Sequence, residues 1–146
     1  MIDKKFIGKV LPAFCAVAEA GQLRFFAKAT GETNPVYLDE SAARDAGHPT
    51  LPLPPTFLFS LELQQPDTSW RDELGIQLSR ILHGEQSFTY HRLAYAGDVL
   101  RFESRIADIY GKKNGALDFV VRETRVTNQK GEHVADLHSV LVQRNG

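Results

Sequence analysis

The chain has 146 residues, 42% hydrophobic and 24% charged, so it fits a single soluble domain, residues 1–146, with a buried core. Its 17 basic and 18 acidic residues are spread along the sequence, which argues against a nucleic-acid or acidic-lipid surface. A single cysteine excludes an internal disulfide and any cysteine-based zinc site, and no stretch matches a signal peptide or a membrane span. We therefore expect a cytoplasmic protein whose partners are small molecules or other proteins.

The first third of the chain predicts one strand and two helices. A strand is expected from Phe14 to Val17, where the run AFCAVA also predicts a buried thiol at Cys15. From about Gly21, apolar side chains recur at helical spacing until Gly31 ends the helix. Asp39 is a favourable N-cap for a second, short helix with the sequence ESAARDA.

A buried helix is predicted in the middle of the chain. The preceding segment HPTLPLPP, residues 48–55, has too many prolines for a helix or a central strand. The run TFLFSLELQQ then begins near Pro55 and Thr56 and carries apolar side chains nearly all round. Such a helix must be surrounded by protein, so we expect a long central helix.

Four long strands are predicted after Arg80, where the hydrophobic period changes to two. The turn signals YAGD, GKKNG and NQKGE separate them, which predicts an antiparallel meander. The expected ranges are Ile81 to Arg92, Val99 to Tyr110, Ala116 to Thr127 and His133 to Arg144. In the third strand, apolar Leu117 and Phe119 alternate with Asp118 and Arg122, so one face should meet a core and the other should be partly wet.

One apolar helix and a long antiparallel sheet predict an α+β fold in which the sheet curls around the helix, the hotdog arrangement. Such a sheet has open edges and covers its helix incompletely. We therefore expect dimerisation by edge pairing of two sheets.

Four runs carry a resemblance to a known family: FAKATGETNPVYLDESAARDAG, PPTF, HGEQSFTYHR and AGDVLRFESRI. They resemble the MaoC-like hydratase/dehydratase family, most closely the N-terminal-type domains of bacterial 3-hydroxyacyl thioester dehydratases, from about Phe6 to Arg144. The resemblance implies a hotdog fold, a thioester of CoA or acyl carrier protein as substrate, and no cofactor. Active members carry the pattern G-D-x-N-P-x-H, in which this chain places Glu32 for the Asp and Tyr37 for the His.

The resemblance implies that Glu32 and Tyr37 are the catalytic pair for reversible hydration of a 2-enoyl thioester. The pair is weakened, because Glu is one methylene longer than Asp and a phenol has a pKa of about 10. Asn34 is expected to brace the loop at the substrate site, and the N–H groups of Thr56 and Phe57 to stabilise the enolate oxygen. Alternatively, Glu32 is a solvated loop carboxylate, Tyr37 packs under the loop, and the two N–H groups bond the Thr56 hydroxyl or water.

Three more residues are candidates. His83 and Glu85 are predicted to share one strand face and could form a substitute acid–base pair, or could simply be a half-exposed face. Glu62, in the apolar helix, must be paired or functional, and hotdog thioesterases of another branch keep a carboxylate there. Five scattered histidines with no carboxylate at ligand spacing predict no metal site.

Three functional hypotheses follow. The first is an R-specific enoyl thioester hydratase or 3-hydroxyacyl dehydratase, a hydro-lyase that uses Glu32 and Tyr37. The second is a non-catalytic acyl-binding subunit that pairs with a related hotdog chain carrying the intact Asp and His. The third is an acyl-CoA thioesterase that uses Glu62.

Overall fold

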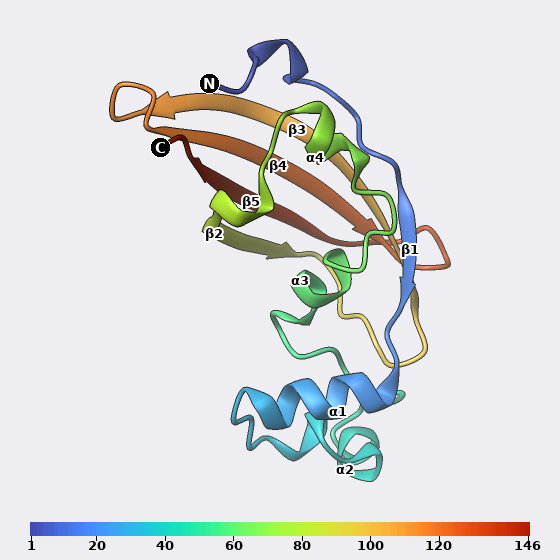
Figure 1. The fold of residues 1–146 in the computed structure, drawn as a ribbon. Helices are drawn as coiled ribbons and strands as arrows, with labels where there is room; N and C mark the ends of the chain where they lie inside the picture. The colour runs from blue at the N-terminus through green and yellow to red at the C-terminus, as the bar shows by residue number, and fades with distance from the viewer.

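The computed structural model describes residues 1–146 as a curved five-stranded antiparallel sheet with short helices on its concave side (Figure 1). The sheet has the strand order β1-β3-β4-β5-β2. Its strands are β1 (Phe14–Val17), β2 (Ile81–Tyr90), β3 (Val99–Lys112), β4 (Leu117–Thr127) and β5 (His133–Arg144). The predicted α+β hotdog arrangement is confirmed. No helix is both long and apolar enough to cross a lipid bilayer.

Two helices lie together at one end of the molecule, beyond the tip of the sheet (Figure 1). They are α1 (Ala20–Ala29) and α2 (Glu40–Asp45). Both follow the predicted signals: Gly31 takes a φ of 72° after α1, and a side-chain oxygen of Asp39 accepts the N–H of Ala42 at 2.8 Å to cap α2. A 3₁₀ turn, Pro35–Tyr37, connects them, and a further short helix, α4 (Ser69–Glu73), packs against the sheet.

The central helix α3 (Phe57–Glu62) is shorter than predicted, with six residues instead of the expected ten. Pro66 disfavours a helical conformation of the residue before it, so the segment cannot continue as a regular helix. That residue, Gln65, instead accepts the indole N–H of Trp70 at 3.3 Å and anchors the connection to α4. Four of the six residues of α3 are buried, which confirms that the helix is surrounded by protein.

The predicted meander is correct only for β3, β4 and β5. Strand β2 forms one edge of the sheet and pairs with β5. Strand β1 forms the opposite edge and pairs with β3. The YAGD segment, residues 95–98, is a turn, since the N–H of Asp98 donates to the carbonyl of Tyr95 at 3.0 Å, but it is not a hairpin turn, because β2 and β3 do not pair. Two of its N–H groups bond earlier parts of the chain. Ala96 donates to the carbonyl of Leu51 and Gly97 to that of Ala18, both at 2.8 Å.

The predicted faces of β4 are wrong, because Asp118 and Arg122 lie on the concave face and not on the wet one. Val120 and Val126 share the concave face with them, whereas Phe119 lies on the convex face, where its ring stacks on Tyr110 with centroids 4.8 Å apart. Asp118 and Arg122 are therefore turned into the fold and must be paired there, whereas Glu123 and Arg125 lie on the convex face.

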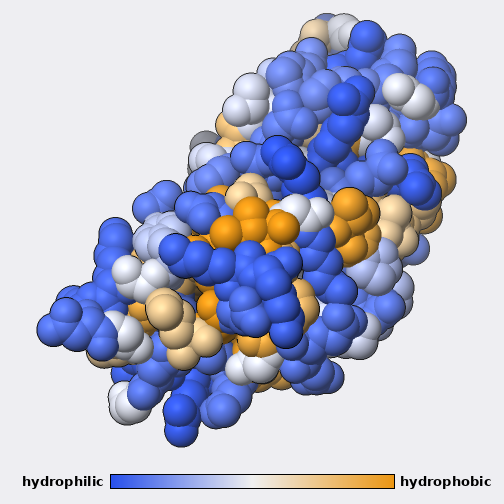
Figure 2. Space-filling model, turned by 90° about the horizontal axis from the view of Figure 1, so that it is seen from above, coloured by the Kyte–Doolittle hydropathy of each residue, from blue (hydrophilic) through white to orange (hydrophobic).

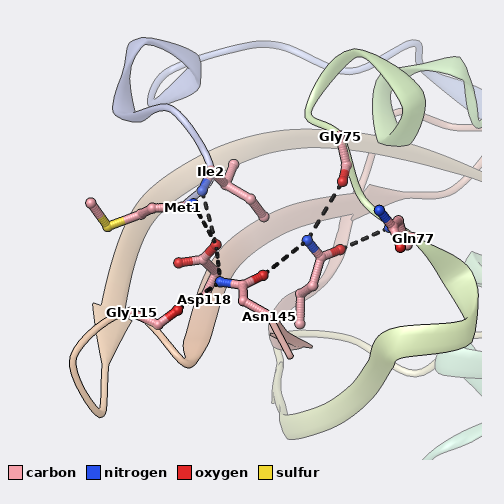
Figure 3. A network of polar contacts seen from close by, with 8 residues as sticks. Met1, Ile2, Gly75, Gln77, Gly115, Asp118 and Asn145 are labelled. Carbon is pink, nitrogen blue, oxygen red and sulfur yellow. Dashed lines mark hydrogen bonds and ion pairs between the residues drawn. The ribbon is translucent and has the colours of Figure 1, made fainter.

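Asp118 is 1% exposed and joins the two ends of the chain (Figure 3). One of its oxygens accepts the N–H of Ile2 at 2.9 Å and the side-chain amide of Asn145 at 2.8 Å. Seen from above, the surface is mostly polar with an apolar area near its middle (Figure 2). Cys15, predicted to be buried, is exposed, because its strand turns Phe14 and Ala16 inward instead.

Candidate active site

The loop between α1 and α2 folds the Glu32 side chain back onto itself. One carboxylate oxygen of Glu32 accepts the N–H groups of Thr33 at 2.9 Å and Asn34 at 2.8 Å. The backbone N–H of Glu32 donates to the carbonyl of Ala27 at 2.9 Å, which fixes the loop to the end of α1. The other carboxylate oxygen makes no hydrogen bond to the protein.

Asn34 braces the turn that follows. Its side-chain oxygen accepts the N–H of Val36 at 3.2 Å, and Pro35 is the first residue of the 3₁₀ turn. The turn points Tyr37 toward the start of α3. The Asn-Pro step thus places a phenol, and not the carboxylate, beside the start of α3.

Tyr37 lines an apolar pocket of about 190 Å³. Its walls come from the 3₁₀ turn, the start of α3, the end of β2 and the loop that follows β2. The lining residues are Tyr37, Leu53, Pro55, Leu58, Tyr90, Arg92, Leu93, Ala94 and Val134. Glu32 is not among them, so the structure brings Tyr37 and the start of α3 together without the predicted carboxylate.

The two predicted oxyanion donors differ in availability. The N–H of Phe57 donates to the carbonyl of Pro54 at 3.0 Å, so it is engaged within the protein. The N–H of Thr56 has no protein acceptor, and this residue is exposed beside the pocket-lining Pro55. Only one of the two predicted donors is therefore free to meet a ligand.

Two pocket residues, Tyr90 and Arg92, were not predicted from the sequence. Partial burial raises the pKa of Tyr90 to about 12, so its phenol stays protonated at neutral pH and can only donate or accept hydrogen bonds there. Arg92 brings a positive charge to the same pocket. The sequence gives no signal for either residue, because the pocket exists only once β2 pairs with β5.

With this geometry established, comparisons with known proteins identify the family. The family model for the FAS1-like dehydratase domain region matches residues 5–137. The chain belongs to this family. A UPF0336 protein of Saccharopolyspora erythraea is 37% identical over 146 residues, which cover 98% of this chain and 92% of that protein.

Solved structures of MaoC-like dehydratases share the hotdog fold of this FAS1-like dehydratase region. The C-terminally truncated HadBC complex of Mycobacterium tuberculosis, a 3R-hydroxyacyl-ACP dehydratase, aligns with a TM-score of 0.78 and 25% identity over 94% of this chain and 96% of that chain. A MaoC-like dehydratase aligns with a TM-score of 0.84 and 22% identity, covering 97% of this chain and 43% of that one. The ChsH1-ChsH2 complex of Mycobacterium tuberculosis gives 0.73 and 20%, covering 94% and 89%. The MaoC-like resemblance is confirmed.

The predicted common face of His83 and Glu85 is wrong. His83 pairs with Leu141 and Glu85 with Val140, and adjacent residues of β5 point to opposite faces of the sheet. A β-bulge at Gly84 supplies the extra residue that separates the two side chains. His83 lines a second hollow of about 160 Å³ between α3, α4 and the sheet, whereas Glu85 is exposed on the convex face.

Glu62 is buried in the core and forms an ion pair with Arg122. Its side chain is 1% exposed and lies 2.7 Å from a terminal nitrogen of Arg122. Its other oxygen accepts the hydroxyl of Thr124 at 2.5 Å, and that hydroxyl also bonds Ser104 at 2.7 Å. One carboxylate oxygen thus faces the Arg122 guanidinium and the other the Thr124 hydroxyl, and Glu62 lines neither the Tyr37 pocket nor the hollow that His83 lines.

Proposed function

We propose that this chain is the acyl-binding subunit of a two-chain hotdog hydratase/dehydratase that acts on 2-enoyl or 3-hydroxyacyl thioesters. The observation that carries the proposal is the lining of the Tyr37 pocket. It is apolar, it lies at the start of the central helix, and it contains no carboxylate and no imidazole. A pocket of this kind can bind an acyl group but holds no base for water.

The polar groups of the pocket suit a thioester of CoA or acyl carrier protein. The phenols of Tyr37 and Tyr90 can hydrogen-bond the thioester or hydroxyl oxygen, and the free N–H of Thr56 lies near the same opening. Arg92, whose guanidinium lies 3.4 Å from a carboxylate oxygen of Glu132, supplies a cation for the phosphate groups of either carrier. No protein-bound cofactor enters this chemistry, which transfers a proton and a hydroxyl.

The acid and base would then come from the second chain. Hydration needs one group to deprotonate the water that attacks C3 and another to protonate C2. The HadBC and ChsH1-ChsH2 structures are each complexes of two named components, which supports a paired assembly here. Strand β2 is the open edge nearest the pocket, so a chain that pairs along it would bring its own residues beside Tyr90.

A second candidate is hydration by this chain alone through Glu32. The free carboxylate oxygen of Glu32 favours it, since the two loop N–H groups hold the other oxygen and orient the group. In that case Tyr37 would position the substrate and Glu32 would activate the water. The two candidates share a substrate and differ in which chain carries the base.

The test is hydration of crotonyl-CoA by this chain alone, and by this chain co-expressed with a hotdog chain from the same genome that carries the intact Asp and His. We expect the two chains to co-purify and only the complex to be active. Tyr37→Ala in this chain should raise the KM of the complex by roughly tenfold, because an apolar wall is removed. Tyr110→Phe, on the convex face, is the matched control and should leave KM unchanged.

Glu32→Gln separates the candidates. The two-chain proposal predicts that the complex keeps its rate in this variant and loses it when the Asp of the partner is replaced by Asn. Activity of the isolated chain equal to that of the complex, abolished by Glu32→Gln, would reject the two-chain proposal and establish the second candidate.

A further inference from the structure

Two histidines and one aspartate meet on the convex face of the sheet, on the opposite side from the Tyr37 pocket. A ring nitrogen of His91, Nε2, lies 2.8 Å from one carboxylate oxygen of Asp136, and Nε2 of His133 lies 2.8 Å from the other. The two imidazole rings have centroids 4.2 Å apart, and the three ligand atoms all lie within 4.8 Å of one another. We propose that this cluster is a binding site for a divalent transition-metal ion of the zinc class.

The backbone explains why these side chains converge. In a regular strand, residues three apart point to opposite faces, so His133 and Asp136 would be separated. The register between β4 and β5 shifts here, since Val126 pairs with Ala135 but Thr127 pairs with His133, which leaves Val134 as an extra residue. The bulge returns both side chains to the convex face.

The same bulge positions the third ligand. The carbonyl of Val134 accepts the N–H of His91 at 2.8 Å and also that of Arg92 at 3.1 Å, so the chain leaving β2 is held against β5. Thr89 of β2 pairs with Asp136 of β5, so the two side chains share the convex face. His91, two residues after Thr89, points to that same face. Spacing along the sequence does not reveal this cluster, because it depends on one bulge and one strand pairing.

The donor set and its spacing fit a zinc-class ion. Two imidazole nitrogens and a carboxylate oxygen are ligands that Zn²⁺ binds at about 2.0–2.2 Å, which places ligand atoms roughly 3.3–3.5 Å apart in a tetrahedral site. Each nitrogen–oxygen distance of 2.8 Å would therefore open by roughly half an ångström, which side-chain rotation can supply. The three side chains are 40%, 28% and 48% exposed, so water can complete the coordination.

A bound ion would tie the end of β2 to the start of β5. Tyr90 and Arg92, the neighbours of His91 on either side, belong to the Tyr37 pocket. The ion would thus stabilise the pocket wall from the convex side of the sheet, without contacting the acyl group. The site stands independently of the proposed function, because no pocket residue is one of its ligands.

The test uses the full chain without an affinity tag, freed of metal by a chelator and carrying Cys15→Ser, since an exposed thiol would also bind zinc. Isothermal titration with Zn²⁺ should give one ion per chain, and Zn²⁺ should raise the Tm. His91→Ala and His133→Ala should each weaken binding by at least about tenfold and reduce the Zn²⁺-dependent rise in Tm.

His138→Ala is the matched control, because His138 lies on the same face of β5 but outside the cluster. It should bind Zn²⁺ as the unsubstituted protein does. Absence of binding at 100-fold excess Zn²⁺, or equal weakening by His138→Ala and His91→Ala, would overturn the proposal. Circular dichroism of each metal-free variant separates loss of a ligand from loss of the fold.

Discussion

Glu62 is the acidic side chain that the central helix carries into the core, and its partner lies far along the chain. The carboxylate meets Arg122 of β4 and the hydroxyl of Thr124. Both side chains of the ion pair are largely removed from water, at 1% and 12% exposure. In such surroundings each charge depends on the other, because neither can recover its hydration inside the fold.

Glu62→Gln should therefore be strongly destabilising. The substitution keeps the shape of the side chain but leaves the Arg122 guanidinium buried without a counter-charge. We expect a loss of about 3–5 kcal/mol in the free energy of unfolding. Urea unfolding followed by circular dichroism measures it.

Glu123→Gln is the matched control for that measurement. Glu123 lies on β4, next to Arg122, and pairs with Arg105 at 2.8 Å, but the side chains of Glu123 and Arg105 are 46% and 61% exposed. An exposed pair of this kind contributes less than about 1 kcal/mol. Equal losses in the free energy of unfolding in the two variants would show that the buried pair contributes no more to stability than the exposed one.

Local chemistry made some residues predictable and left others hidden. The side chains of Asn34 and Asp39 bond N–H groups two and three residues away, so their roles follow from the sequence around them. The ionic partner of Glu62 and the pocket role of Tyr90 depend on which strands pair, and no local pattern records that. The carboxylate of Glu32 was placed in the site by resemblance, and the structure turns it toward its own loop.

At the scale of elements, Gly84 decides how β2 presents its side chains. A period of two, extended through this glycine, puts His83 and Glu85 on one face, and the bulge reverses that assignment. A glycine inside a strand pattern often marks a bulge or a close approach of another chain segment. Gly84 marks a bulge and also a close approach, since atoms of β5 lie directly against its Cα.

Gly84→Ala should destabilise the domain. The added Cβ would lie 2.7 Å from a methyl of Val142 and 3.2 Å from the carbonyl oxygen of Val140, so β5 must move. Overpacking of this kind costs roughly 1–3 kcal/mol. The measurement is the urea midpoint, together with the thermal unfolding curve.

Gly21→Ala provides the contrast. Gly21 lies inside α1, and a Cβ there would meet no atom within 4 Å. Alanine restricts the unfolded chain and suits a helix, so the variant should gain roughly 0.5–1 kcal/mol. A neutral or stabilising Gly84→Ala would mean that β2 and β5 are not packed as closely as the structure has them.

At the scale of the whole molecule, the sequence predicted the architecture but not the complete strand order. Hydrophobic period, turn residues and one apolar run are enough for a sheet around a helix. They do not show that the chain leaves β2 for the opposite side of the sheet, because the YAGD turn resembles a hairpin signal while its N–H groups bond Leu51 and Ala18. That crossing makes β2 an open edge beside the pocket.

The open edge predicts how the chain associates. Leu82 is an apolar residue of β2 that is 53% exposed, which is unfavourable unless another strand covers it. We expect the isolated chain to form a dimer of twice its 16.3 kDa mass through β2, and the related hotdog chain to compete for the same edge. Leu82→Lys should weaken both associations by at least about tenfold, because either partner would lose an apolar contact and the homodimer would also bring two lysines to its paired edges. Light scattering on a sizing column measures the mass of each assembly.

Val10→Lys is the control, because Val10 is 76% exposed and lies at the other edge of the sheet, and it should leave the mass unchanged. An unaltered mass in Leu82→Lys would place the interface elsewhere.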